Sequence, residues 1–104
     1  KEHVSTCRFD FSNLKDTVDM LKEKNVPVYF TVDLDVLDPS VFPGTGTPEA
    51  GGVTYLQLTD AIKKVTELNI VGMDIVELSP PYDSSGSSTA LACKLLREIL
   101  LYLS

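Results

Sequence analysis

Two aspartates end a strongly apolar stretch of the chain. Residues 28–32 read Val-Tyr-Phe-Thr-Val, and Asp33-Leu34-Asp35 follows directly. Because residues i and i+2 of a strand point to the same face, we expect both carboxylates on one side, roughly 7 Å apart along the chain. Neighbouring carboxylates repel each other unless one is protonated, both stay hydrated, or a cation lies between them. We therefore expect a divalent metal here, with Mg²⁺ or Mn²⁺ ahead of zinc, since no His or Cys is near.

A D-x-D spacing by itself is also compatible with plain structural roles. Asp33 and Asp35 could be capping or loop acids at the end of a strand. Asp38 precedes Pro39 and is typical of a turn start, because an Asp side chain bonds the backbone two residues on. The Gly-Thr-Gly-Thr run at 44–47 could bind phosphate through its amides, but it lacks the order of a P-loop and no Lys follows.

The other residues that could do chemistry have structural interpretations. Asp74 falls inside an expected strand, where a carboxylate needs a partner such as a Lys, an Arg or a backbone amide. His3 is the single histidine, and we expect a solvated or structural role for it. Cys7 and Cys93 lack the spacing of a zinc site or a disulfide framework, so we expect two buried, reduced thiols.

The strands that must position the aspartates lie in a mixed order of helices and strands. Apolar, β-branched and aromatic runs at 28–32 and 70–76 predict two strands of a parallel sheet, each buried on both faces. Residues 36–53 hold four Gly and three Pro, which predicts a long ordered loop. Gly72 within the second strand indicates a close approach of the backbone to a neighbour.

Three helices are expected around these strands. Ser12 could cap the first helix, which should end near Asn25. A capping box at 54–57 should open the second, with Asn69 as its C-cap. The third should run from about residue 89 to 103, and it is apolar nearly all round, so much of it should be buried.

Strands that alternate with helices indicate an α/β layer with a parallel sheet. Ligands on such sheets bind beyond the carboxyl ends of the strands. Asp33, Asp35 and Glu77 each lie at such an end. Two or three strands make a poor sheet, so we expect this chain to be part of a larger α/β domain.

Composition limits the function classes. A chain of 104 residues, 43% hydrophobic and 23% charged, fits one small globular domain and no disordered class. The formal net charge of −6 disfavours binding to nucleic acid. No apolar run is long enough to span a bilayer, and Lys1-Glu2-His3 opens no signal peptide, so we expect a cytoplasmic protein without a membrane partner.

Three motifs closely resemble the final third of the ureohydrolases, the family of arginases and agmatinases. They are Val-Asp-Leu-Asp-Val-Leu-Asp-Pro at 32–39, Pro-Gly-Thr-Gly-Thr-Pro at 43–48 with Gly51-Gly52, and Gly-Met-Asp-Ile-Val-Glu-Leu-Ser-Pro at 72–80 with Tyr82-Asp83. They occur in the family's order over about residues 27 to 103. The resemblance implies a three-layer α/β/α arginase-like fold with a parallel sheet, of which residues 1–104 form the C-terminal part of a single domain.

The resemblance also implies roles for four residues. Asp33 and Asp35 match metal ligands of a dinuclear manganese site, and Thr47 and Glu77 match residues of the guanidinium pocket. The His-containing segments that supply the remaining ligands, and the His assigned to proton transfer, are absent from this sequence. No catalytic residue is therefore assigned, and we expect residues 1–104 alone to be inactive and to bind metal weakly.

The function implied is manganese-dependent hydrolysis of a small guanidino compound to urea and an amine. The Ser-Pro-Pro-Tyr-Asp run at 79–83 resembles agmatinases more than arginases, which favours agmatine, with arginase or guanidinobutyrase specificity as alternatives. A non-catalytic truncated module that acts only in assembly is another alternative. A metal-dependent deacetylase of the same broad fold is a third, which the 43–48 loop and Glu77 disfavour. The implied partners are the missing N-terminal part of the same domain and further copies in a homo-oligomer.

Overall fold

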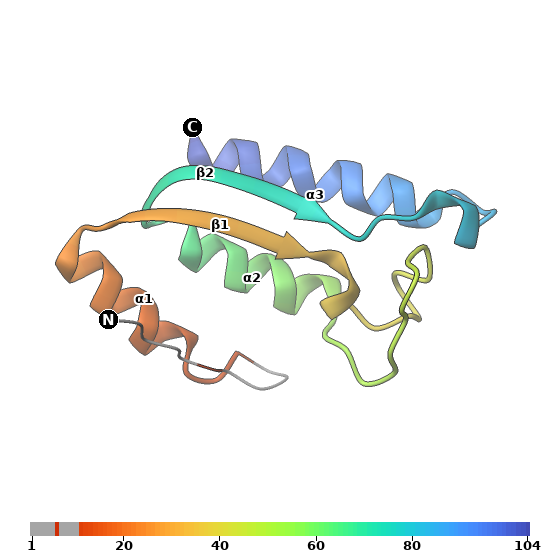
Figure 1. Cartoon of the computed structure of the whole chain (residues 1–104), viewed down its shortest axis with the longest axis horizontal. Coiled ribbons are helices and arrows are strands. Elements are labelled where there is room, and N and C mark those ends of the chain that lie inside the picture. The colour runs from red at the N-terminus through yellow and green to blue at the C-terminus, as the bar shows by residue number, and fades with distance from the viewer. Residues whose placement is uncertain (1–5, 7–10) are drawn as a thin grey trace.

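The computed structural model describes residue 6 and residues 11–104, so the interpretations of His3 and Cys7 lie outside the described residues. Figure 1 shows the element order: helix α1 (Leu14–Lys24), strand β1 (Pro27–Asp33), helix α2 (Tyr55–Val65), strand β2 (Asn69–Val76) and helix α3 (Ser87–Leu103). Short 3-10 turns at Leu34–Val36 and Pro80–Tyr82 follow the two strands. The predicted alternation of helices and strands is confirmed.

Strands β1 and β2 pair in parallel, with Asp33 opposite Val76, so both strands end at the same edge. The register slips between Val28 and Tyr29, where Val71 is the extra residue on β2. A Cβ on Gly72 would lie 3.0 Å from the Tyr29 ring, which confirms the expected close approach at this glycine.

One face of the two strands carries the core. Helices α2 and α3 pack together against the side chains of β1 and β2 that alternate toward them. The loop after β1 also contributes, which confirms that residues 36–53 are ordered. The buried core residues are Val32, Leu34, Leu37, Phe42, Val53, Leu58, Ile62, Ala92, Leu95 and Ile99.

The opposite face of the strands is exposed, so the expectation of burial on both faces is wrong for the described part of the chain. Tyr29 is 62% exposed and Val71 is 65% exposed. A sheet is buried on both faces only when helices cover each of them. Among the described helices, α2 and α3 cover one face of the sheet. Leu100 and Leu101, on the side of α3 that faces away from the core, are also exposed, because no described segment covers them.

Helix ends follow local hydrogen bonds. The capping box that begins α2 is confirmed: the Thr54 hydroxyl accepts from the Gln57 N–H at 3.0 Å, and the Gln57 side chain accepts from the Thr54 N–H at 2.9 Å. Helix α1 ends at Asn25 in the left-handed conformation, as expected. Its N-cap is Asn13, however, and not Ser12.

Two further expectations at helix ends and surfaces are wrong. Asn69 does not cap α2, because the chain turns at Thr66 and Asn69 already begins β2. Cys93 is exposed on α3 rather than buried, because Ala92 and Leu95 are the residues that face the core. Within the described residues, no helix is both long and apolar enough to cross a membrane.

Candidate functional site

The acidic residues lie where the two parallel strands end. Asp33 is the last residue of β1, and Glu77 follows directly after β2. From the sequence we expect Asp35 to continue the strand on the same face as Asp33. This expectation is wrong, because Asp35 lies in the 3-10 turn Leu34–Val36. The fully buried Leu34 fixes this turn, because its side chain enters the core while the residues on either side of it stay at the edge.

Asp33 has a structural role in this turn. Its Oδ1 accepts a hydrogen bond from the Asp35 N–H at 3.1 Å, which caps the turn. The capping interpretation of Asp33 is therefore confirmed. This cap uses one carboxylate oxygen, so it is compatible with a ligand on the other.

The electrostatics of the site show that its acids share one environment. Burial raises the pKa of Asp33, and a hydrogen bond with the Asp35 side chain and the charges of Asp35 and Glu77 raise it further. The Asp35 N–H acts in the opposite direction. None of the three ion pairs in the described part of the chain involves these acids. Like charges that gather without a basic partner favour a bound cation.

The long loop after β1 returns to this edge through Thr47. The Thr47 hydroxyl donates to Asp35 Oδ2 at 3.0 Å, across twelve residues of sequence. Thr47 therefore contacts Asp35, and the register of the parallel strands places Asp33 and Glu77 at the same edge of the sheet.

Asp38 anchors the other end of this loop. Its carboxylate accepts hydrogen bonds from the Ser40 side chain and N–H, and from the N–H groups of Gly51 and Gly52 at 3.0 and 3.2 Å. These bonds lower the pKa of Asp38 to about 2. A Cβ on Gly52 would lie 2.5 Å from the Asp38 nitrogen, so the loop can close only on glycine. The turn-forming interpretation of Asp38 is confirmed.

Glu77 has a strained backbone. Its φ angle is +78°, in the left-handed region that residues with a Cβ rarely adopt. Such strain costs about 1–3 kcal/mol and gathers at functional sites, where the surrounding structure enforces it. The strain therefore indicates that neighbouring residues hold the backbone of Glu77 in this conformation.

Asp74 lies two positions from the strand end, on the exposed face of the sheet. It accepts hydrogen bonds from the Tyr29 hydroxyl at 2.9 Å and from the Thr31 hydroxyl, which lies opposite it in the register. Asp74 therefore has partners, as expected, but they are hydroxyl groups and not a Lys, an Arg or a backbone amide. The bond to Asp74 raises the pKa of Tyr29.

The acids fit a metal ion only as part of a ligand set. Among the described residues, no group of three or more His, Cys, Asp or Glu side chains is placed so that it could hold a metal. Hard divalent ions take about six or more donors. Asp33 and Asp35 supply oxygen donors of the right kind, and a cation between them would relieve the repulsion between their charges.

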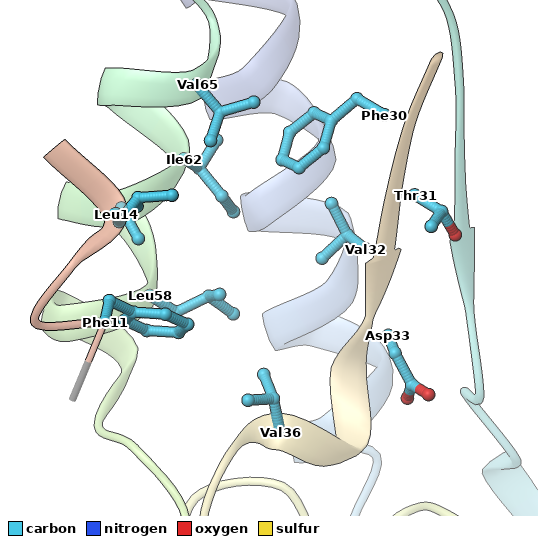
Figure 2. Close-up of a pocket in the computed structure, with 11 residues that line it drawn as sticks. Phe11, Leu14, Phe30, Thr31, Val32, Asp33, Val36, Leu58, Ile62 and Val65 are labelled. Atoms are coloured by element: carbon cyan, nitrogen blue, oxygen red, sulfur yellow. The ribbon is translucent and has the colours of Figure 1, made fainter. Parts of the chain in front are cut away.

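A hollow of about 280 Å³ lies on the other side of β1, between this strand and α2. Figure 2 shows Phe30 and Val32 pointing toward Ile62, whereas Thr31 and Asp33 point away from them. The walls are almost wholly apolar, and Asp33, the single charged residue of the lining, directs its carboxylate away from Ile62. The acidic edge, and not this hollow, is therefore the candidate site.

Comparison with known proteins matches a family described as the arginase family over residues 3–102. An agmatinase of Bacillus anthracis is 46% identical over 101 residues, which cover 94% of this chain and 34% of the relative. A guanidinobutyrase of Pseudomonas aeruginosa is 47% identical over 77 residues, which cover 74% of this chain and 24% of the relative.

The fold is similar to that of a solved candidate agmatinase from Clostridium difficile. The TM-score is 0.81 at 52% identity, over 90% of this chain and 34% of the other. The chain thus spans about a third of the length of this protein and of the Bacillus anthracis relative.

Proposed function

Because the chain belongs to the arginase family, we propose that the complete protein is a manganese-dependent hydrolase that converts a guanidino compound, preferably agmatine, to urea and an amine. Residues 1–104 would form the C-terminal part of its single α/β domain. The rest of the domain would supply the remaining metal ligands.

The observation that carries this proposal is the gathering of Asp33, Asp35, Thr47 and Glu77 at one edge of the sheet. A guanidinium group is a planar cation with several N–H donors, and a carboxylate binds it through paired hydrogen bonds. Glu77 and the Thr47 hydroxyl would hold and orient this group. Asp33 and Asp35 would hold the metal beside it.

The reaction adds water to the guanidinium carbon. The bond from this carbon to the alkyl nitrogen then breaks, and that nitrogen takes a proton and leaves as the amine, with urea as the second product. Bound manganese would supply a nucleophile at neutral pH by lowering the pKa of water. Glu77 contributes orientation, because a fixed guanidinium group presents its carbon to attack without further loss of freedom.

Two observations support agmatine. A relative that is an agmatinase matches 94% of the chain. Agmatine carries two positive charges, and a chain with a net charge of −6 attracts it more strongly than a zwitterionic guanidino acid. The guanidinobutyrase relative supports the alternative.

The test is urea release by the complete protein from agmatine, arginine and guanidinobutyrate in the presence of Mn²⁺. We expect the largest kcat/KM for agmatine. A larger kcat/KM for guanidinobutyrate or arginine would reject agmatine as the preferred substrate. Absence of urea release from all three compounds would reject the proposed function.

The second candidate is a non-catalytic module that acts in assembly. It is favoured by the absence of a complete metal-binding cluster among the described residues. Calorimetric titration of residues 1–104 with Mn²⁺ addresses it. We expect weak binding, which fits both candidates, whereas tight binding of two ions would show a complete site and reject the module. Urea release by the complete protein would also reject it.

We also propose that the complete protein is a cytoplasmic homo-oligomer. The exposed leucines of α3, Leu96, Leu100, Leu101 and Leu103, support the association of this helix with further protein. Light scattering of the complete protein tests the oligomer, and a monomer would reject it.

A further inference from the structure

Gly44 joins three segments that come from different parts of the sequence. Its N–H donates to the Ser88 hydroxyl at 2.9 Å, and its carbonyl accepts from the Ser79 N–H at 2.7 Å. Ser88 lies at the start of α3, and Ser79 lies two residues after Glu77. The loop of Thr47, the segment of Glu77 and the N-terminus of α3 therefore meet at one residue.

Asp83 completes this junction. Its Oδ2 accepts from the Ser88 hydroxyl at 2.6 Å and from the Ser88 N–H at 2.8 Å. The Ser88 hydroxyl thus donates to Asp83 and accepts from Gly44 at the same time. These bonds, with those from Ser85, hold the pKa of Asp83 well below its usual range, so it stays ionised.

The centre of the junction is buried, and its space is limited. Ser88 is fully buried, and Gly44 is buried beside it. A Cβ on Gly44 would lie 2.6 Å from the Ser88 Cβ and 3.2 Å from the Asp83 Cβ. A buried polar group that loses its partner is costly, so the loop has one favoured position here.

We propose that Asp83 and Ser88 are positioning residues for substrate binding, which hold Gly44 so that Thr47 and Glu77 lie at a fixed separation. The proposal rests on the proposed function. Thr47 is three residues from Gly44, and a released segment of three residues can move by several ångströms, since each residue spans about 3.3–3.6 Å when extended. Such a movement would break the bond from Thr47 to Asp35.

The chain offers a matched control at Ser87. Its hydroxyl donates to the same oxygen of Asp83 at 3.2 Å, but Gly44 is bonded by Ser88. Ser87→Ala therefore removes a hydroxyl from the same carboxylate and leaves the bond between Ser88 and Gly44 in place.

The experiment compares agmatine kinetics of Ser88→Ala and Ser87→Ala in the complete protein. We expect Ser88→Ala to raise KM about tenfold, with less than threefold change in kcat, which is the size of effect expected when the buried Gly44 N–H loses its partner. Ser87→Ala should stay within twofold. Equal effects of the two substitutions would overturn the proposal.

A double-mutant cycle with Thr47→Ala separates positioning from general stability. If Ser88 acts through Thr47, Ser88→Ala should raise KM less than twofold when Thr47 is already alanine. A full tenfold rise in that background would overturn the role of Thr47. Asp83→Asn serves as the second variant if Ser88→Ala does not fold, because it weakens the same bonds without emptying the site, and it should raise KM about threefold. No rise would overturn the proposal.

Hydrogen exchange measures the stability of the junction independently of enzyme activity. The Gly44 amide should exchange at least tenfold faster in Ser88→Ala than in Ser87→Ala. Absence of urea release by the unsubstituted protein would reject the proposed function and the substrate role of the junction. Unchanged exchange in a fully active protein would reject only the junction.

Discussion

Two groups of acidic residues in the segments after the strands differ in the hydrogen bonds that their carboxylates accept. Asp38 and Asp83 accept several N–H and O–H groups from their own chain, and the pKa of each is lowered. Asp33 is exposed but lies close to Asp35 and Glu77, and a partial loss of hydration together with these like charges raises its pKa. Asp38 and Asp83 hold the loops in place. The charges of Asp33, Asp35 and Glu77 repel one another, and a cation would relieve this repulsion. The difference separates carboxylates that hold a loop in place from carboxylates that lie close to like charges.

The largest expected effect that sharpens this comparison is on turnover. Glu77→Ala in the complete protein should lower kcat/KM for agmatine by about a thousandfold or more, because the guanidinium cation loses its paired carboxylate. Manganese content, measured by plasma emission spectroscopy, should stay within about a fifth of that of the unsubstituted protein. Loss of manganese would instead make Glu77 a metal ligand.

The next effect is on metal affinity. Asp35→Asn should weaken Mn²⁺ binding to the complete protein by about a hundredfold, because a neutral amide replaces an anionic donor. Asp38→Asn is the matched control, since it removes a structural carboxylate three residues away. Its Mn²⁺ affinity should change less than threefold, and equal losses in both variants would erase the distinction between the groups.

A smaller effect concerns the pH dependence of stability. The pKa of Asp38 is about 2 in the folded chain, below the value of about 3.9 for an unfolded Asp. Its contribution is therefore fully present above about pH 4 and is lost as the pH falls toward 2. Urea denaturation between pH 5 and 2 should show a weaker pH dependence in Asp38→Asn than in the parent. Identical pH profiles would show that this carboxylate does not stabilise the loop.

The smallest effect is a gain in stability. Glu77→Gly should raise the Tm by a few degrees, because glycine adopts the φ of +78° without strain. Glu77→Ala is the control, since it removes the same charge but keeps the Cβ, so its Tm should be lower than that of Glu77→Gly. A lower Tm for Glu77→Gly than for Glu77→Ala would mean that the backbone here is not strained.

Much of the fold could be predicted because its signals are local. The capping box at Thr54 and the apolar run before Asp33 each specify an element from a few neighbouring residues. The exposure of Cys93 and of one sheet face could not be predicted, since burial depends on what lies against a surface. The end of β1 next to Asp33 was predicted, but the 3-10 turn that takes Asp35 out of the strand was not, because it depends on Leu34 filling the core.

The candidate site was predictable in part. The resemblance of three motifs pointed to Asp33, Asp35, Thr47 and Glu77, and their placement at one edge follows from the parallel strands. The junction of Gly44, Asp83 and Ser88 was missed, because its bonds join residues up to 44 positions apart. The glycine at 44 was the available signal, since a buried contact excludes a Cβ there.

A crystal structure of the complete protein grown with Mn²⁺, measured for manganese anomalous scattering, tests the acidic edge most directly. Peaks should lie within roughly 2–2.6 Å of carboxylate oxygens of both Asp33 and Asp35, with Glu77 outside the ligand shell. Manganese bound elsewhere, with these two aspartates satisfied only by groups of their own chain, would contradict the account.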